Sequence, residues 1–178
     1  MTQRAGAAQE TGGSGWRGWL TVAAVFVVVA VVLALSPGVV NVGALANAQF
    51  KTPDLAPLLA RPFVVQAHVV SVLIALTLGP VQLALPKGGV RHRAVGWVWA
   101  VAMAVVAVSG LFVSSLRFSP LHVLSAIVLI FLPLGIWFAR TGRVGSHQRT
   151  MIALYIGLVV AGVLAVAPGR LLWEMLVR

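Results

Sequence analysis

Long runs of apolar residues, broken by short polar segments, make up most of the chain. Five runs are long enough to cross the hydrocarbon core of a bilayer as helices. They cover residues 18–35, 63–85, 94–115, 120–139 and 151–168. Because lipid offers backbone groups no hydrogen-bond partner, each run is expected to form a helix rather than an open strand. The pattern predicts an all-α integral membrane protein with five transmembrane helices.

The polar segments divide the chain into parts. Residues 1–17 are rich in small and polar residues without an apolar period, which predicts a disordered cytoplasmic N-terminus. Residues 18–35 are expected to form an uncleaved transmembrane anchor, because the cleavage-like Ala46-Asn47-Ala48 lies well beyond the apolar run. Residues 36–62 then form an outer loop, and residues 63–178 form a four-helix repeat bundle with pseudo-two-fold symmetry.

Composition narrows the class further. With 60% apolar residues, 9% charged residues and a mean hydropathy of +1.02, the chain has too few polar groups to cover a soluble globule. The net charge of +10 comes from basic residues that stand singly in loops, which excludes a nucleic-acid-binding face. The absence of cysteine excludes disulfides, thiolate metal sites and covalent haem attachment.

The basic residues of the short loops predict the orientation. Those on one side are Lys87, Arg91 and Arg93 after the second run, and Arg140, Arg143 and Arg149 after the fourth. The loop on the opposite side carries only Arg117. Since basic loops stay in the cytoplasm, the N-terminus is expected inside and the C-terminus outside. The expected location is the bacterial plasma membrane, which the chain crosses several times.

The four histidines fall in two copies of one pattern. Each copy has a histidine, a serine three positions later, a proline, a short basic loop and a second histidine. The first copy contains His68, Ser71, Pro80 and His92, and the second contains His122, Ser125, Pro133 and His147. An internal repeat of titratable, metal-ligating side chains predicts a cofactor site between symmetry-related helices.

The predicted topology arranges these histidines as two pairs. His68 and His122 lie near the outer face, whereas His92 and His147 lie where helices leave the cytoplasmic loops. In an up-and-down bundle each pair comes from diagonal helices about 11–14 Å apart, which suits two imidazoles that bind one haem from both sides. The two pairs are separated by about 25 Å along the membrane normal. We therefore expect haem b, as one or two groups, with the four histidines as iron ligands.

Other interpretations remain open at these residues. A single interfacial histidine is usually hydrogen-bonded to the backbone or to a lipid headgroup. At the inner pair, Arg93 and Arg149 make an anionic headgroup or a phosphate-bearing ligand a competing occupant. On the outer side, Arg117 and Arg170 are candidates for contact with haem propionates or an anionic electron partner, with solvated interfacial charge as the alternative.

Three motifs accompany the histidines. They are Leu78-Gly79-Pro80-Val81-Gln82, His92-Arg93-x-x-Gly96 and His147-x-Arg149-x-Met151, and the late segment Arg170-Leu171-Leu172-Trp173 follows them. With these motifs residues 68–173 resemble an uncharacterised bacterial integral membrane family, catalogued as a domain of unknown function. The family commonly has a tryptophan and a further arginine where this chain has Thr150 and Ala153, and it does not generally require the histidine at His122.

The ligand layout, as distinct from the sequence, is similar to that of the cytochrome b561 family of transmembrane di-haem proteins. That resemblance implies electron transfer from a reductant on one side of the membrane to an acceptor on the other. The function favoured is therefore a membrane b-type cytochrome, acting as a transmembrane oxidoreductase with a quinol or another small reductant as donor. The alternative is a haem-free small transporter or an accessory subunit that binds a protein partner in a larger membrane complex. The lack of a charged residue in the middle of any span counts against coupled transport.

Overall fold

The computed structural model describes residues 51–113 and 120–165, together with residues 23, 27 and 175. The described ranges form helices and contain no strand. The helices are α3 (Ala56–Leu59), α4 (Phe63–Ala84), α5 (Val90–Val113), α6 (Pro120–Arg140) and α7 (Val144–Ala165). The predicted disordered N-terminus and first transmembrane anchor lie outside the described residues, apart from two isolated positions in the anchor.

The four long helices match four of the predicted spans, but two of them begin earlier than expected. α5 begins at Val90 rather than at residue 94, and α7 begins at Val144 rather than at residue 151. The hydrogen bond from His147 N to Arg143 O shows that regular helix continues through polar residues at the start of α7. The histidines placed at loop borders are therefore held in the first turns of helices.

Three of these helices are long and apolar enough to cross a membrane, over Phe63–Ala84, Val90–Val113 and His122–Arg140. α7 has 22 residues, which corresponds to about 33 Å, but its first turns are polar. Large apolar side chains point outward on the long helices, among them Leu73 on α4 and Ile130 on α6. An outer surface of this kind suits lipid rather than water.

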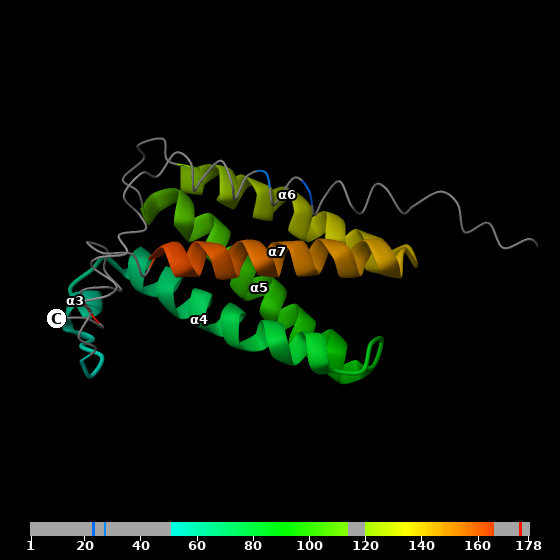
Figure 1. Ribbon diagram of the computed structural model, residues 1–178, viewed down its shortest axis with the longest axis horizontal. Coiled ribbons are helices and arrows are strands. Elements are labelled where there is room, and N and C mark those ends of the chain that lie inside the picture. Colours follow the sequence, from blue (N-terminus) through cyan, green and yellow to red (C-terminus); the bar gives the residue numbers. More distant parts are fainter. Residues whose placement is uncertain (1–22, 24–26, 28–50, 114–119, 166–174, 176–178) are drawn as a thin grey trace, which may run out of the picture.

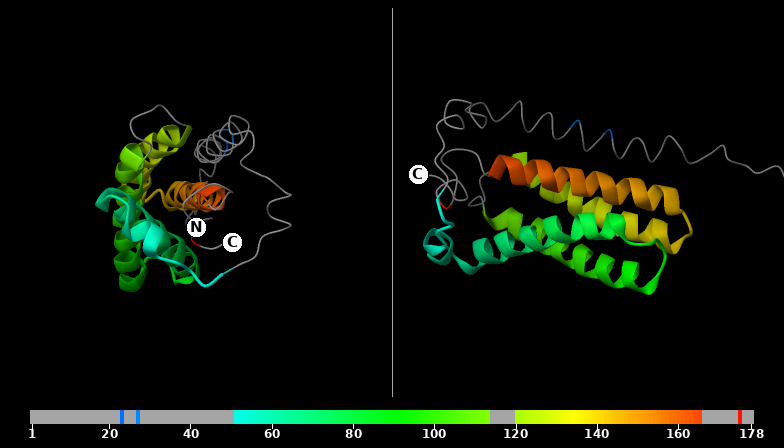
Figure 2. Two further views of the ribbon diagram at one scale, coloured as in Figure 1. Left: turned by 90° about the vertical axis from the view of Figure 1, so that its left-hand side faces the viewer. Right: turned by 60° about the horizontal axis from the view of Figure 1, so that its bottom comes forward.

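Consecutive helices run in opposite directions and pack side by side, and α7 returns to contact α4 (Figures 1 and 2). Among the described helices, the backbone of α4 does not come close to that of α6, nor the backbone of α5 to that of α7, so these pairs stand diagonally. Buried side chains from all four fill the space between them: Ala75, Trp99, Ala100, Ala102, Met103, Leu132, Leu154 and Leu158. The α4–α5 and α6–α7 loops lie at one end, at the right in Figure 1, called the loop end below; the opposite end is called the far end.

Pro80 explains how α7 is held against α4. Proline has no backbone N–H, so the carbonyl of Leu76 one turn earlier has no donor within the helix. The hydroxyl of Tyr155 on α7 donates to this carbonyl at 3.3 Å. Gly79 makes room for the ring, because a Cβ at this position would lie 2.2 Å from Tyr155 Cε2. The proline thus converts a backbone carbonyl of α4 into an acceptor for a neighbouring helix.

The orientation predicted from the loops can be tested by cysteine labelling, since the chain has no cysteine of its own. Gly88 and Gly142 adopt φ angles of 81° and 74°, which strain any other residue. Gly89 and Gly145 are exposed and have open space around them. Cysteines at these two positions are expected to resist an impermeant thiol reagent in intact cells, whereas a control cysteine at Thr52 is labelled. Labelling at both glycine positions in intact cells would reverse the orientation.

Candidate functional site

The two predicted histidine pairs lie at opposite ends of the helices. His68 and His122 are near the starts of α4 and α6 at the far end, and His92 and His147 are in the first turns of α5 and α7 at the loop end. All four side chains are half-buried. Each makes a hydrogen bond to a helix next to its own, or a close polar contact there.

At the far end, His68 is fixed by a serine of α5. Its Nδ1 lies 2.9 Å from Ser109 Oγ, and Ser109 is buried. The serine hydroxyl already donates to the carbonyl of Val105, so its oxygen is the acceptor and His68 Nδ1 carries the proton. The other ring nitrogen, Nε2, therefore has the lone pair. Sequence analysis missed Ser109, although a polar residue late in an apolar run is the signal that marks it.

His122 is bonded through Nε2, whereas His68 is bonded through Nδ1. Its Nε2 donates to the backbone carbonyl of Leu111 on α5 at 3.2 Å, so this nitrogen carries a proton. Gly110 of α5 lies between Ser125 of α6 and His68 of α4. A Cβ on Gly110 would be 2.8 Å from Ser125 Oγ and 3.5 Å from His68 Cε1. Both far-end histidines are thus bonded to the last turns of α5.

At the loop end, His147 is fixed by the backbone of α6. Its Nδ1 lies 2.9 Å from the carbonyl oxygen of Gly135, which only accepts hydrogen bonds, so Nδ1 carries the proton and Nε2 the lone pair. The two helices are close here, since a Cβ on Gly135 would lie 2.3 Å from Met151 Cε and 3.1 Å from Thr150 Cγ2. The motif residues His147 and Met151 therefore both pack against one glycine.

Gln82 of α4 connects the loop end to α5. Its Nε2 donates to the carbonyl of His92 at 2.8 Å and lies 3.0 and 3.2 Å from the two ring nitrogens. Gly96 leaves space for this side chain, because a Cβ there would lie 2.9 Å from Gln82 Nε2. The motif residues Gln82, His92 and Gly96 thus form one contact between two helices.

Two buried polar atoms at the loop end have no hydrogen-bond partner within the described structure. They are Oε1 of Gln82 and Oγ1 of Thr150, whose residue is fully buried. His147 and His92 lie in the first turns of α7 and α5 at this same end. We call Gln82, His92, His147 and Thr150 the loop-end cluster. Together with the Gly135 carbonyl, it draws polar groups from all four long helices, and its orphaned atoms leave hydrogen-bonding capacity for a ligand.

The predicted arginine sites are only partly visible. Arg93 is exposed and Arg149 half-buried, both in the first turns of their helices beside the loop-end histidines. Arg117 and Arg170 lie outside the described residues. Among the residues that the structure describes, no group of three or more His, Cys, Asp or Glu side chains is placed to hold a metal ion.

Comparison with known proteins identifies the family. The model of a family described as "Predicted membrane protein (DUF2306)" matches residues 65–177, which include all four histidines and all of α4 to α7 except the first two residues of α4. Neither a curated protein nor a solved structure matches the chain. The resemblance to an uncharacterised membrane family is confirmed, while the similarity of layout to cytochrome b561 proteins stays a hypothesis. The chain belongs to the DUF2306 family of membrane proteins.

Proposed function

We propose that this protein is a membrane b-type cytochrome that moves electrons across or within the bilayer. The observation that carries the proposal is the state of two histidine rings. His68 and His147 each donate from Nδ1 to a fixed oxygen and keep a lone pair on Nε2. Ligating histidines almost always have such a partner on the second nitrogen, because it sets the ring orientation and raises ligand basicity.

The loop-end pair fits haem better than the far-end pair does. His122 donates from Nε2 to a fixed backbone carbonyl, and this bond would have to break before the nitrogen could ligate iron. His92 instead contacts a glutamine side chain, which can turn on its own bonds. Gln82 Oε1 lacks a donor, so a turned amide would be able to accept the ring proton of His92 and leave the other nitrogen for a metal.

The surroundings of the loop-end pair suit a dianionic macrocycle. Arg93 and Arg149 stand one and two positions after the histidines, and guanidinium groups pair well with carboxylates such as haem propionates. The sequence has no acidic residue between Asp54 and Glu174, so helices α4 to α7 are basic and contain no carboxylate side chain. Bound haem would supply one-electron redox chemistry. The chain would contribute axial imidazoles, charge balance and a low-dielectric setting.

A second candidate, a haem-free transporter or an accessory subunit of a larger complex, is favoured by a different observation. All four histidine rings already have polar partners within the protein. Buried polar groups satisfied in this way stabilise helix packing without any ligand.

An absorption spectrum decides between the two candidates. The protein is purified after expression with ample haem supply, and spectra are recorded in the oxidised and then the reduced state. The expected result is the spectrum of low-spin haem b with bis-imidazole ligation, at one or two haems per chain. Protein from cells unable to make haem serves as the control. Folded protein free of haem under both conditions would contradict the cytochrome proposal and leave the second candidate.

A further inference from the structure

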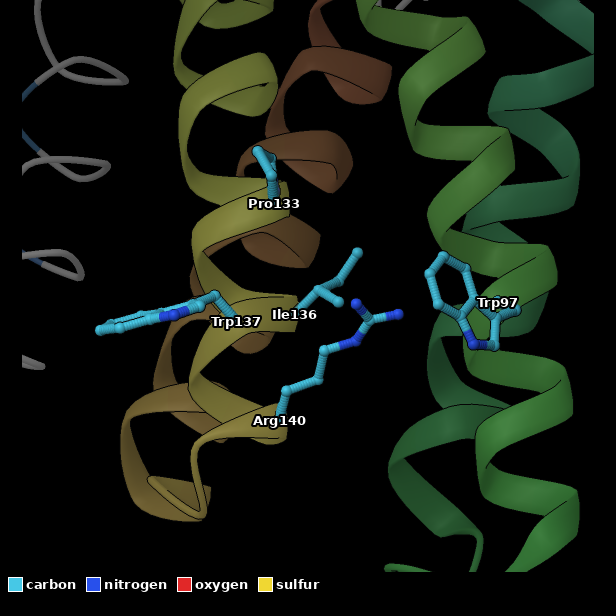
Figure 3. A pocket seen from close by; sticks show the side chains of 5 residues that line it. All are labelled: Trp97, Pro133, Ile136, Trp137 and Arg140. Atoms are coloured by element: carbon cyan, nitrogen blue, oxygen red, sulfur yellow. The ribbon is translucent and has the colours of Figure 1, made fainter.

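A pocket of about 230 Å³ lies between α5 and α6 near the loop end, away from the histidine rings. Trp97 of α5 lines one side, and Pro133, Ile136, Trp137 and Arg140 of α6 line the other, with the ring of Trp137 turned away from Trp97 (Figure 3). The lining is apolar apart from Arg140, whose side chain reaches from α6 toward Trp97 (Figure 3). Pockets that enclose a whole small molecule measure about 300–1,000 Å³, so this one suits a segment of an elongated molecule.

Two arginines near the end of α6 stand over tryptophan rings, and one of them, Arg140, lines the pocket. The guanidinium carbon of Arg140 lies 5.9 Å from the ring centre of Trp97, and that of Arg143 lies 5.3 Å from the ring centre of Trp137. A ring face attracts the cation and orients it without neutralising its charge. Arg140 is exposed as well as lining the pocket, so its N–H donors can reach a ligand there.

The positive charges around the pocket have no acidic counterpart within helices α4 to α7. The loop end also carries Lys87, Arg91 and Arg93, and the sequence has no acidic residue between Asp54 and Glu174. Arg140 is the last residue of α6, where a cation also interacts favourably with the helix dipole, but this interaction leaves a full positive charge. An anion in this region would therefore meet several cations and no carboxylate of the helices.

The order of groups along α6 matches the order of groups in a lipid. Arg140 ends the apolar span His122–Arg140, and Pro133 lies about 10 Å deeper. Trp97 and Trp137 are half-exposed near the same boundary, a position that tryptophan favours at membrane interfaces. A molecule with an anionic head at Arg140 and an apolar chain toward Pro133 would meet suitable groups along its whole length.

We propose that the α5–α6 pocket binds one anionic phospholipid from the leaflet on the loop side. Arg140 donates to its phosphate, and Trp97, Pro133 and Ile136 contact the upper part of one acyl chain. This site is independent of the histidines, so it holds whether or not the protein binds haem.

The test measures lipid binding to the full-length protein. Purified, delipidated protein in mild detergent is titrated with phosphatidylglycerol or phosphatidylcholine, and the lipid-bound species are counted by native mass spectrometry. Wild-type protein is expected to prefer phosphatidylglycerol by about tenfold, the size of one or two hydrogen bonds to a charged group. Arg140→Gln is expected to lose most of this preference.

The matched control is Arg91→Gln, which removes the same charge from an exposed arginine at the loop end outside the pocket. It is expected to keep the preference within about twofold, because a single-lipid site depends on contacts rather than on net charge. Arg140→Lys keeps the charge and is expected to retain part of the preference. Thermal melting of each variant checks that the fold is unchanged.

Four results would overturn the proposal. Equal losses for Arg140→Gln and Arg91→Gln would show attraction by a diffuse basic surface. Equal binding of the two lipids by wild-type protein would show that the pocket recognises acyl chains alone. Competition by inorganic phosphate as strong as that by phosphatidylglycerol would make a free anion the ligand, and retention of a neutral quinone in place of phospholipid would make the pocket a quinone site.

Discussion

Replacing His147 with alanine is expected to reduce the haem content of the purified protein by one haem, and replacing His92 is expected to do the same. Under the proposed function the two rings hold a single haem from opposite sides, so either loss leaves one axial ligand. The double variant is then expected to lose little more than each single variant, as for residues that act as one unit. Haem per chain is measured by the pyridine haemochrome method.

The far-end pair supplies the comparison. His68→Ala and His122→Ala are expected to remove a second haem where one is present, and their effect should add to that of the loop-end variants because about 25 Å of helix separates the ends. Gln148→Ala is the control, since Gln148 is exposed and adjoins His147 in α7. If His92→Ala and His147→Ala leave the haem content unchanged while His68→Ala abolishes it, the protein holds one far-end haem. The loop-end cluster would then serve a headgroup or a partner protein.

The long helices could be predicted because lipid restricts the choice of backbone. An apolar run of this length in a bilayer has to satisfy its own N–H and C=O groups, and α4 and α6 accordingly begin and end within one residue of the predicted spans. The starts of α5 and α7 were placed several residues late. Hydropathy marks where the apolar layer begins, whereas a helix continues into the polar region as long as its backbone hydrogen bonds continue.

The partners of the site residues could not be predicted in the same way. The repeat correctly placed the histidines at two ends, since rise along a helix follows from residue number. The repeat does not determine how far each helix is rotated about its own axis. This rotation decides which residues face each other, so the contacts of His68 with Ser109 and of His147 with Gly135 could not be predicted. The carbonyl released by Pro80 was foreseeable, but its donor, Tyr155, depends on how α7 packs on α4.

Gly79→Ala is expected to destabilise the protein by about 1–3 kcal/mol, the usual cost of forcing an extra group into a packed core. The new Cβ would lie 2.2 Å from Tyr155 Cε2 and 2.9 Å from Cζ. An aromatic ring is rigid, so the whole ring has to move, and its hydroxyl then leaves the Leu76 carbonyl that Pro80 deprives of a helix donor. The free energy of unfolding is compared by melting in detergent with intrinsic tryptophan fluorescence.

Gly135→Ala is the matched control on α6. Its Cβ would lie 2.3 Å from Met151 Cε, the end of a flexible side chain that can rotate away. The next atom, Thr150 Cγ2 at 3.1 Å, would have to shift by only a few tenths of an ångström. Gly135→Ala is therefore expected to cost clearly less than Gly79→Ala. Loss of the hydroxyl alone, in Tyr155→Phe, is expected to cost about 0.6 kcal/mol, the average for a hydrogen bond between membrane helices.

A double-mutant cycle assigns the effect to the ring. In a Tyr155→Ala background the space beside Gly79 is empty, so adding Gly79→Ala is expected to cost little or to stabilise the protein by filling part of the cavity. Equal costs of Gly79→Ala in the two backgrounds would mean that the ring does not lie against α4. The α4–α7 contact would then have to be held by other groups, and the role assigned to Pro80 in freeing an acceptor for Tyr155 would be wrong.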